Sequence, residues 1–268
     1  RNIKAADCAL CGQCITHCPV AALSGRDDKR PVFSQNGMLN TRRKTTVVQV
    51  APAVRTAWAE AFKLSRKFAS PERLAGALRL MGFDYVFDTN FAADLTIMEE
   101  ATEFQYRLEK HIAGDKDVKL PILTSCCPAW SVMAKKTLPE YAHYISMSLT
   151  PMVLTARMIK KQHPECKVVF IGPCAAKKLE ASRHSVRSDV DFVLTFEETM
   201  GLFDAKAVDF KSLEVEEPLQ TSSALGKGFA SSGGVAQAVV KVINEMRPDM
   251  EVKTVKAEGL AECKKMLM

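Results

Sequence analysis

The 268-residue sequence lacks the long hydrophobic runs that would place a protein in a membrane. No apolar stretch approaches the roughly 20 residues that a membrane-spanning helix requires. No apolar signal core stands near the first residue, and internal repeats and low-complexity tracts are absent. These absences predict a cytoplasmic protein without a membrane partner. A disulfide framework is not expected in such a chain, so the nine cysteines indicate metal or redox chemistry.

Aromatic residues are also scarce, at 7% of the sequence. Basic clusters such as residues 42–44 (RRK) have no aromatic residues between them, which argues against nucleic acid as a partner. The formal net charge of +6 has two readings. It is either plain solubility or a means of attracting an acidic redox partner, such as a small ferredoxin.

Short apolar or β-branched runs alternate with helical stretches. We expect strands at 46–50, 84–88, 121–125, 167–172, 191–195 and 250–255, and helices most clearly at 92–112, 151–163 and 234–246. The alternation predicts an α/β fold with largely parallel strands. Residues 25–44 are polar and rich in turn formers, so we expect a linker there. Ligands bind beyond the carboxyl ends of such strands, so the cysteines after 121–125 and 167–172 predict one shared site.

The first cysteine motif is Cys8-x-x-Cys11-x-x-Cys14-x-x-x-Cys18-Pro19. This spacing is typical of bacterial ferredoxins, in which three cysteines bind one 4Fe–4S cluster and the fourth binds another. Zinc is the alternative metal, but it usually takes separated cysteine pairs. Cys18 has no companions here. Either a partner motif precedes residue 1 or one cluster takes all four cysteines, and we favour the first.

Two further motifs are residues 124–130 (TSCCPAW) and 173–180 (PCAAKKLE). They resemble the first two signatures of iron-only (FeFe) hydrogenases, and the resemblance extends over essentially the whole chain. It implies a two-lobed α/β catalytic domain with mainly parallel sheets flanked by helices, preceded by a small ferredoxin-like segment. Residues 1–30 would form the partial ferredoxin-type segment and residues 31–268 the catalytic domain. The simpler reading of TSCCPAW is a pair of buried thiols at a strand end.

The resemblance implies that Cys127 and Cys174 are two of four ligands of a 4Fe–4S cubane. In the family, this cubane is joined to a two-iron subsite that carries CO, CN and a bridging dithiolate. Lys177 would donate a hydrogen bond to a cyanide, and Pro52 would line the two-iron pocket. Otherwise Lys177 simply solvates the start of a helix. A Cys-x-x-Gly-Cys signature, which would supply the other two ligands, is absent, so we expect the parent protein to continue beyond residue 268.

The resemblance makes Cys126 the proton carrier, with Glu100, Glu103 and Ser146 behind it as a relay. A thiol suits this role because it gives and regains protons near neutral pH. Glu100 and Glu103 are three residues apart, on one helix face. The alternative for both is an ordinary solvated face.

The family therefore implies a hydrogenase that reversibly reduces protons to molecular hydrogen. Its expected partners are a ferredoxin or similar low-potential electron carrier and hydrogenase maturation proteins, and a homo-oligomer is left open. The alternatives are a non-catalytic relative that takes part in iron–sulfur assembly, a hydrogen sensor and a simple electron-transfer module. The Cys126–Glu100–Glu103–Ser146 set favours turnover.

Overall fold

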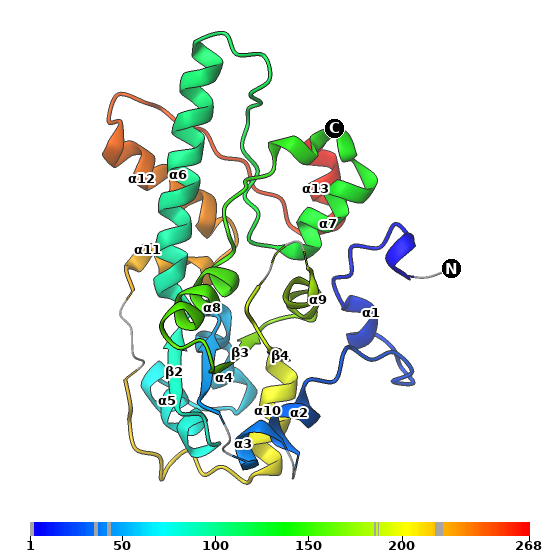
Figure 1. Ribbon diagram of the computed structural model, residues 1–268, viewed down its shortest axis with the longest axis vertical. Coiled ribbons are helices and arrows are strands. Elements are labelled where there is room, and N and C mark those ends of the chain that lie inside the picture. The colour runs from blue at the N-terminus through cyan, green and yellow to red at the C-terminus, as the bar shows by residue number, and fades with distance from the viewer. Residues whose placement is uncertain (1–2, 35–36, 42–43, 185, 187, 218–221) are drawn as a thin grey trace.

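The computed structural model describes residues 3–34, 37–41, 44–184, 186, 188–217 and 222–268 (Figure 1). Its centre is a sheet of four parallel strands in the order β2-β1-β3-β4. The strands are β1 (Thr46–Val50), β2 (Tyr85–Asp88), β3 (Lys167–Gly172) and β4 (Phe192–Thr195). Val48 on β1 pairs with Val86 on one side and Val169 on the other, and all three are buried. Apolar residues on both faces of a strand are the pattern of a sheet covered on both sides.

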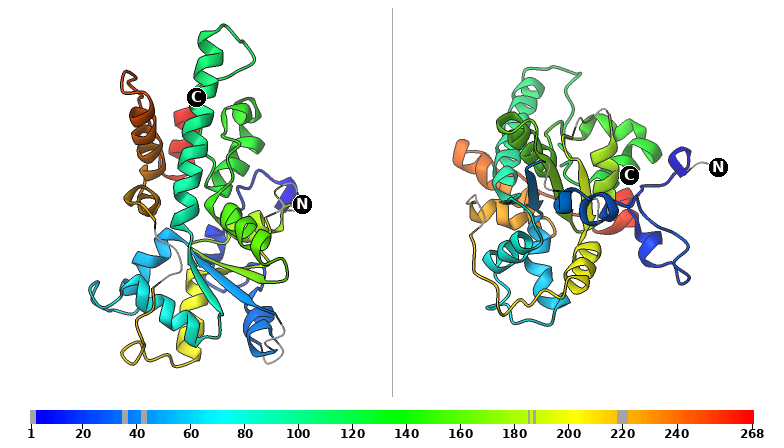
Figure 2. Two further views of the ribbon diagram at one scale, coloured as in Figure 1. Left: turned by 60° about the vertical axis from the view of Figure 1, so that its left-hand side comes forward. Right: turned by 60° about the horizontal axis from the view of Figure 1, so that its bottom comes forward.

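Helices cover this sheet and extend beyond it (Figures 1 and 2). The first half of the chain contains α1 (Gln13–Thr16), α2 (Lys29–Phe33), α3 (Met38–Thr41), α4 (Pro52–Ala61), α5 (Pro71–Leu80), α6 (Asn90–Ile112) and α7 (Pro128–Thr137). The second half contains α8 (Pro151–Gln162), α9 (Ala176–Ser182), α10 (Phe196–Ala205), α11 (Ala224–Lys227), α12 (Gly234–Met246) and α13 (Gly259–Leu267). Short 3₁₀ turns are η1 (Ile3–Ala5), η2 (Pro139–Tyr144) and η3 (Gly228–Ala230). Helices α4, α5, α7 and α8 begin with proline, whose fixed φ suits the first helical position.

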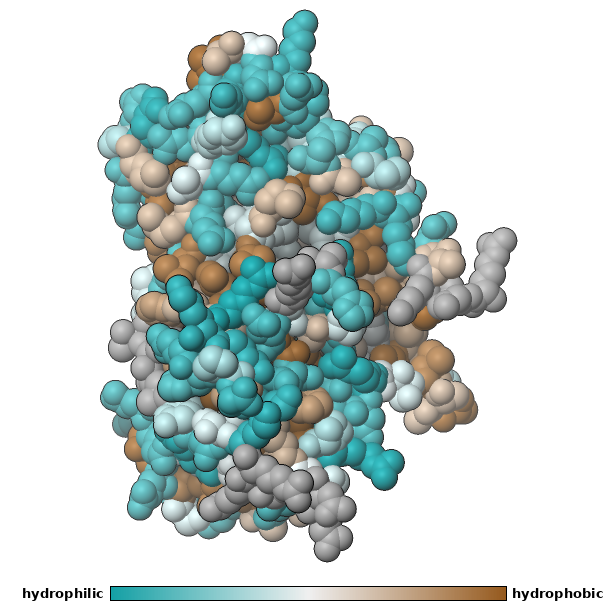
Figure 3. Space-filling view, viewed as in Figure 1, coloured by the Kyte–Doolittle hydropathy of each residue, from teal (hydrophilic) through white to brown (hydrophobic). Residues whose placement is uncertain are grey.

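Two hydrophobic clusters stabilise the fold. The larger cluster surrounds the sheet and includes the fully buried Trp58. The smaller one joins α6 to α12 through residues such as Ile97 and Val242, away from the sheet. The face in Figure 3 is mostly hydrophilic, with hydrophobic residues in small groups between the polar ones. Within the described ranges, no helix is long and apolar enough to cross a membrane.

The structure confirms the α/β class, four of the expected strands and the long helix α6. The strand expected at 121–125 is wrong, because this segment forms a single isolated bridge between Leu123 and Ile145. The residues directly before Ile145 form η2, so the backbone pairing does not extend beyond this bridge. The strand expected at 250–255 is also wrong. Its apolar residues Met250 and Val252 pack on the smaller cluster instead of pairing in a sheet.

The linker expected at 25–44 is wrong in part. This segment contains α2 and α3, and Val32 and Leu39 are buried in the larger cluster. The Asp28 carboxylate is also buried and accepts a 2.8 Å hydrogen bond from the backbone N–H of Val193 on β4. The segment was predicted as a linker because most of its residues are polar and only a few of them face the core.

Candidate functional site

Two of the predicted site residues lie at the carboxyl edge of the sheet. Pro52 is the first residue of α4, directly after β1. Cys174 lies between the end of β3 and the start of α9. The two loops are joined where the N–H of Ala51 donates a 2.9 Å hydrogen bond to the carbonyl of Ile171. The two loops therefore open at the same edge, because β1 and β3 are neighbouring parallel strands.

The Cys126–Cys127 pair comes from a loop outside the sheet, not from a strand end as expected. Cys127 is the N-cap residue of α7 and is exposed, whereas Cys126 is half-buried. Burial raises the pKa of the Cys174 thiol, the N–H of Ala176 lowers it, and the charge of Cys127 raises it further. The thiols of Cys127 and Cys174 are thus close enough to interact electrostatically, although they belong to different loops.

The Cys126 thiol is held in its neutral form. Burial raises its pKa to about 12, the ammonium of Lys177 opposes this shift, and the charges of Glu100 and Cys127 add to it. A thiol with this pKa keeps its proton throughout the neutral range. Such a group is a weak acid that carries its proton at neutral pH and regains it readily after losing it.

Lys177 connects the two cysteine loops. Its Nζ donates a 3.0 Å hydrogen bond to the carbonyl of Cys126 and a 2.7 Å hydrogen bond to the Glu180 carboxylate. The Lys177 and Glu180 side chains are only 13% and 6% exposed, so this is a largely buried ion pair. The reading of Lys177 as a solvated helix start does not fit this burial. Glu180 belongs to the PCAAKKLE motif, and its pairing with Lys177 follows from their spacing of three residues.

Glu100 lies on the face of α6 that is turned towards the cysteine loop. The residue is 1% exposed, and its Oε1 accepts a 3.4 Å hydrogen bond from the N–H of Ser125. Burial raises the pKa of Glu100 to about 7, with the Ser125 N–H acting against the shift and the charge of Glu103 adding to it. Its Oε2 is buried and has no hydrogen-bond partner among the described residues. A carboxyl group with a pKa near neutrality and an unused oxygen is suited to proton exchange.

Glu103 and Ser146 form the next contact along α6. The Ser146 hydroxyl donates a 2.7 Å hydrogen bond to Glu103 Oε2, which also accepts a 3.1 Å hydrogen bond from the N–H of Met147. Glu103 Oε1 pairs with Arg107 one turn further along the helix. Arg107 was not predicted from the sequence, although the i,i+4 spacing of opposite charges could have indicated it. Glu100 and Glu103 are therefore both partnered side chains, not parts of a solvated face.

The four N-terminal cysteines lie in a short segment around α1. Cys14 is exposed and Cys8, Cys11 and Cys18 are half-buried. The N–H of Leu10 donates a 3.3 Å hydrogen bond to Cys8 Sγ. Backbone N–H groups at 20, 23 and 22 lower the pKa of the Cys18 thiol, which favours the thiolate that binds metals.

The donor set of these loops fits the two iron–sulfur groups that the motifs imply. Cys127 and Cys174 supply two interacting thiols, and the N-terminal segment supplies four, with N–H groups directed at Cys8 and Cys18. Backbone N–H groups near ligand sulfurs are typical of iron–sulfur proteins. In the part of the chain that the structure describes, no three His, Cys, Asp or Glu side chains gather around a point where one metal ion would bind. The assignment of these cysteines as cluster ligands therefore rests on the sequence motifs.

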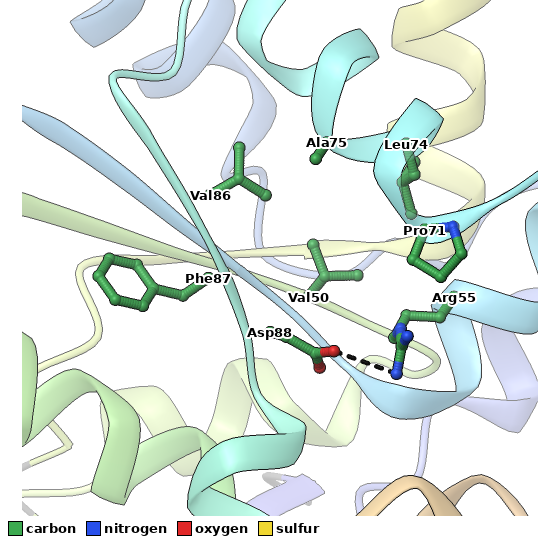
Figure 4. A pocket seen from close by; sticks show the side chains of 8 residues that line it. All are labelled: Val50, Arg55, Pro71, Leu74, Ala75, Val86, Phe87 and Asp88. Carbon is green, nitrogen blue, oxygen red and sulfur yellow. Dashed lines mark ion pairs between the residues drawn. The ribbon is translucent and has the colours of Figure 1, made fainter. Parts of the chain in front are cut away.

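A small pocket at the ends of β1 and β2 is separate from the cysteine loops (Figure 4). Its polar residues are Arg55 and Asp88, which form a 3.0 Å ion pair. Burial raises the pKa of Asp88, and its contacts with the N–H of Asn90 and the charge of Arg55 oppose this shift. The cavity measures about 10 Å³, room for about one water molecule, so it is a structural feature of the sheet edge.

Comparison with known proteins decides the family. A sequence profile described as "Iron only hydrogenase large subunit, C-terminal domain" matches residues 44–268. The chain belongs to the iron-only hydrogenase family. It is 38% identical to the NADP-reducing hydrogenase subunit HndD of Solidesulfovibrio fructosivorans, over 97% of this chain and 46% of that protein. The structure resembles an apo FeFe hydrogenase of Chlamydomonas reinhardtii with a TM-score of 0.66 and 33% identity, covering 81% of this chain and 59% of the other.

The chain is also similar to a protein whose name gives a different role. The chain is 31% identical to a probable cytosolic Fe–S cluster assembly factor of Nematostella vectensis, over 85% of this chain and 57% of that protein. The chain spans about half the length of these curated relatives. Membership of the family therefore does not decide between a hydrogenase and an assembly factor.

Proposed function

We propose that this chain is the catalytic part of an iron-only hydrogenase that interconverts protons, electrons and molecular hydrogen. The observation that carries the proposal is the line of groups from Ser146 and Glu103 through Glu100 to the loop of Cys126. The line combines a hydroxyl, a carboxyl with a pKa near neutrality and a protonated thiol. An assembly factor that does not turn over protons has no need for such a route.

In this proposal, Glu103 and Ser146 exchange protons with the surface and Glu100 passes them to Cys126. The Glu100 Oε2 atom is the acceptor on the inner side, because Oε1 is already engaged by the Ser125 N–H. Burial keeps Glu100 near the middle of its titration at neutral pH, so it both takes and gives a proton at little cost. Cys126 then delivers the proton to the site between the cysteine loops.

Cys127 and Cys174 would hold the 4Fe–4S cubane, and Pro52 would line the pocket of the two-iron subsite with its CO, CN and bridging dithiolate ligands. When bound, this group would pass electrons from the donor to protons and would provide an open iron position for hydrogen chemistry. Lys177 orients the site: it holds the Cys126 carbonyl and presents a charged donor to an anionic ligand. Its partner Glu180 keeps that ammonium in place.

Electrons would reach the site through the N-terminal segment. We assign residues 1–30 to the ferredoxin-type segment, with Cys8, Cys11, Cys14 and Cys18 as ligands, and residues 31–268 to the catalytic domain. The proposed electron donor is a ferredoxin or a similar low-potential carrier, and maturation proteins would install the two-iron subsite. The net charge of +6 favours an acidic donor, and a cytoplasmic location fits these partners.

A second candidate function, iron–sulfur assembly, is favoured by the similarity to the Nematostella vectensis protein. It predicts the cubane without the two-iron subsite. Loading the full-length protein with the two-iron subsite separates the two functions. Hydrogen evolution from a strong reductant after loading supports the hydrogenase, and no loading and no hydrogen support the assembly role.

The role of Cys126 is tested in the same assay. Cys126→Ala should remove most turnover while the cluster spectra persist, because the proton donor is lost and the ligand Cys127 remains. Cys166→Ala is the matched control, since Cys166 is a buried thiol directly before β3, at the opposite end of that strand from the loop of Cys174. Wild-type rates in Cys126→Ala would refute the relay.

A further inference from the structure

Helix α7 contacts the N-terminal segment at the residue that begins its cysteine motif. Lys136, near the end of α7, donates hydrogen bonds from its Nζ to the carbonyl of Ala6 at 2.9 Å and to the carbonyl of Cys8 at 3.1 Å. The same helix begins next to Cys127, so one rigid element links the two predicted cluster sites. An ammonium that donates to the carbonyls of both Ala6 and Cys8, from 128 or more residues away, holds this part of the backbone in one place.

The loop that contains Cys174 also contacts the N-terminal segment. Gly12 lies between Cys11 and Cys14 in the left-handed conformation, with φ of 84°. A Cβ on Gly12 would lie 2.8 Å from the Cβ of Ala175, the residue after Cys174. The backbone of one cysteine motif thus packs directly on the other, and Figure 1 shows α1 beside α9.

The far end of the segment is attached by residues that are remote from the cysteines. Lys178 on α9 donates a 2.8 Å hydrogen bond to the carbonyl of Arg26 and pairs with Glu198 at 2.8 Å. Arg26 in turn pairs with the buried Asp28. These contacts hold the segment whatever happens at Lys136. Lys136 differs from these residues because its side chain bonds directly to the backbone of a predicted cluster cysteine.

We propose that Lys136 is a positioning residue for the N-terminal 4Fe–4S cluster, and that its charge raises the reduction potential of that cluster. The proposal rests on the function proposed above. A reduced cluster carries one more negative charge than an oxidised one, so a fixed cation beside Cys8 favours the reduced form. Lys136 is half-buried, and its charge is therefore screened less than that of its exposed neighbour Lys135.

The test is a potentiometric titration of the N-terminal cluster, followed by electron paramagnetic resonance, with an external low-potential reductant as the electron source. It uses the full-length protein with its 4Fe–4S clusters and without the two-iron subsite, so it does not depend on hydrogen turnover. The signal is assigned by its loss in Cys11→Ala. Lys136→Met should lower the reduction potential. Lys136→Arg keeps the positive charge and should have a potential close to that of the wild type. The control Lys135→Met should leave the potential unchanged.

An unchanged potential in Lys136→Met, or an equal shift in Lys135→Met, would overturn the role of Lys136. If Lys136→Met loses the cluster, retention with a wild-type potential in Lys136→Arg supports the role, and loss from both variants overturns it. A wild-type protein that assembles no N-terminal cluster would refute the electron route of the proposed function itself, and the present inference with it.

Discussion

The Ser146 hydroxyl donates a 2.7 Å hydrogen bond to the Glu103 carboxylate, 43 residues earlier in the sequence. Ser146 is buried and follows the isolated bridge at Leu123 and Ile145. The bond therefore joins α6 to the segment that returns beside the cysteine loop. It is the outer step of the proposed proton route.

Removing this hydroxyl should slow turnover without harming the clusters. For Ser146→Ala in the matured protein we expect roughly a hundredfold loss of hydrogen evolution, the scale of a general acid–base contribution. Thr102→Ala is the control, because Thr102 is exposed on the same helix beside Glu103. Equal rates in wild type and Ser146→Ala would show that protons take another route.

The raised pKa of Glu100 makes stability depend on pH. Between the ordinary value of 4.5 and about 7, the folded state binds more protons than the unfolded state, so the free energy of unfolding falls as pH rises. The free-energy cost of burying the ionised Glu100 carboxylate is absent below pH 4.5 and complete above pH 7. Glu100→Gln should remove it, with a gain over wild type that reaches about 3 kcal/mol at pH 8 and is small at pH 5.

Urea unfolding at the two pH values measures this gain. Glu99→Gln serves as the control, since Glu99 is an exposed neighbour on α6. A gain in Glu100→Gln that does not grow with pH would contradict the buried, half-titrated carboxyl.

The Lys177–Glu180 pair should behave as a buried ion pair. Lys177→Met leaves the Glu180 carboxylate buried without its cation, and we expect a loss of about 3 kcal/mol in the free energy of unfolding. The double variant Lys177→Met/Glu180→Gln should recover much of this loss, because no buried charge remains. Additive losses in this double-mutant cycle would mean that the two side chains do not interact.

Gly12 tests the contact between the two cysteine motifs. Gly12→Ala places a methyl 2.8 Å from Ala175 and also strains the backbone, so we expect a lower content of the N-terminal cluster. Gly114→Ala is matched for backbone strain, since Gly114 has φ of 87° and its added Cβ meets no described atom within 4 Å. Iron analysis should show a loss in Gly12→Ala only, and Ala175→Gly should restore it. A similar effect at Gly114 would mean that the contact is unimportant.

The sequence predicted four of the six expected strands correctly. The sheet strands were predictable because β-branched runs such as 46–50 and 167–172 are buried on both faces. Residues 121–125 (PILTS) are also apolar and β-branched in part, but a strand needs a neighbour, and the chain at 145 provides only one bridge. Composition alone does not contain that information.

The candidate site could also be predicted from the sequence only in part. The resemblance to the family predicted Cys126, Cys127, Cys174 and Lys177 as site residues, and the structure brings their two loops together. The contacts of Lys136 with the Cys8 backbone were not predictable, because a lysine on a helix surface carries no signal for a carbonyl 128 residues away. Long-range contacts of this kind require the fold.

In the proposed site, Cys127 and Cys174 bind the same iron–sulfur cluster. The most direct measurement is cluster content by Mössbauer spectroscopy in the full-length protein, for Cys127→Ala, Cys174→Ala and the double variant. If the two thiols share one cubane, each single variant loses the same cluster and the double variant loses nothing more. Additive losses, or full cluster content in either single variant, would contradict the account.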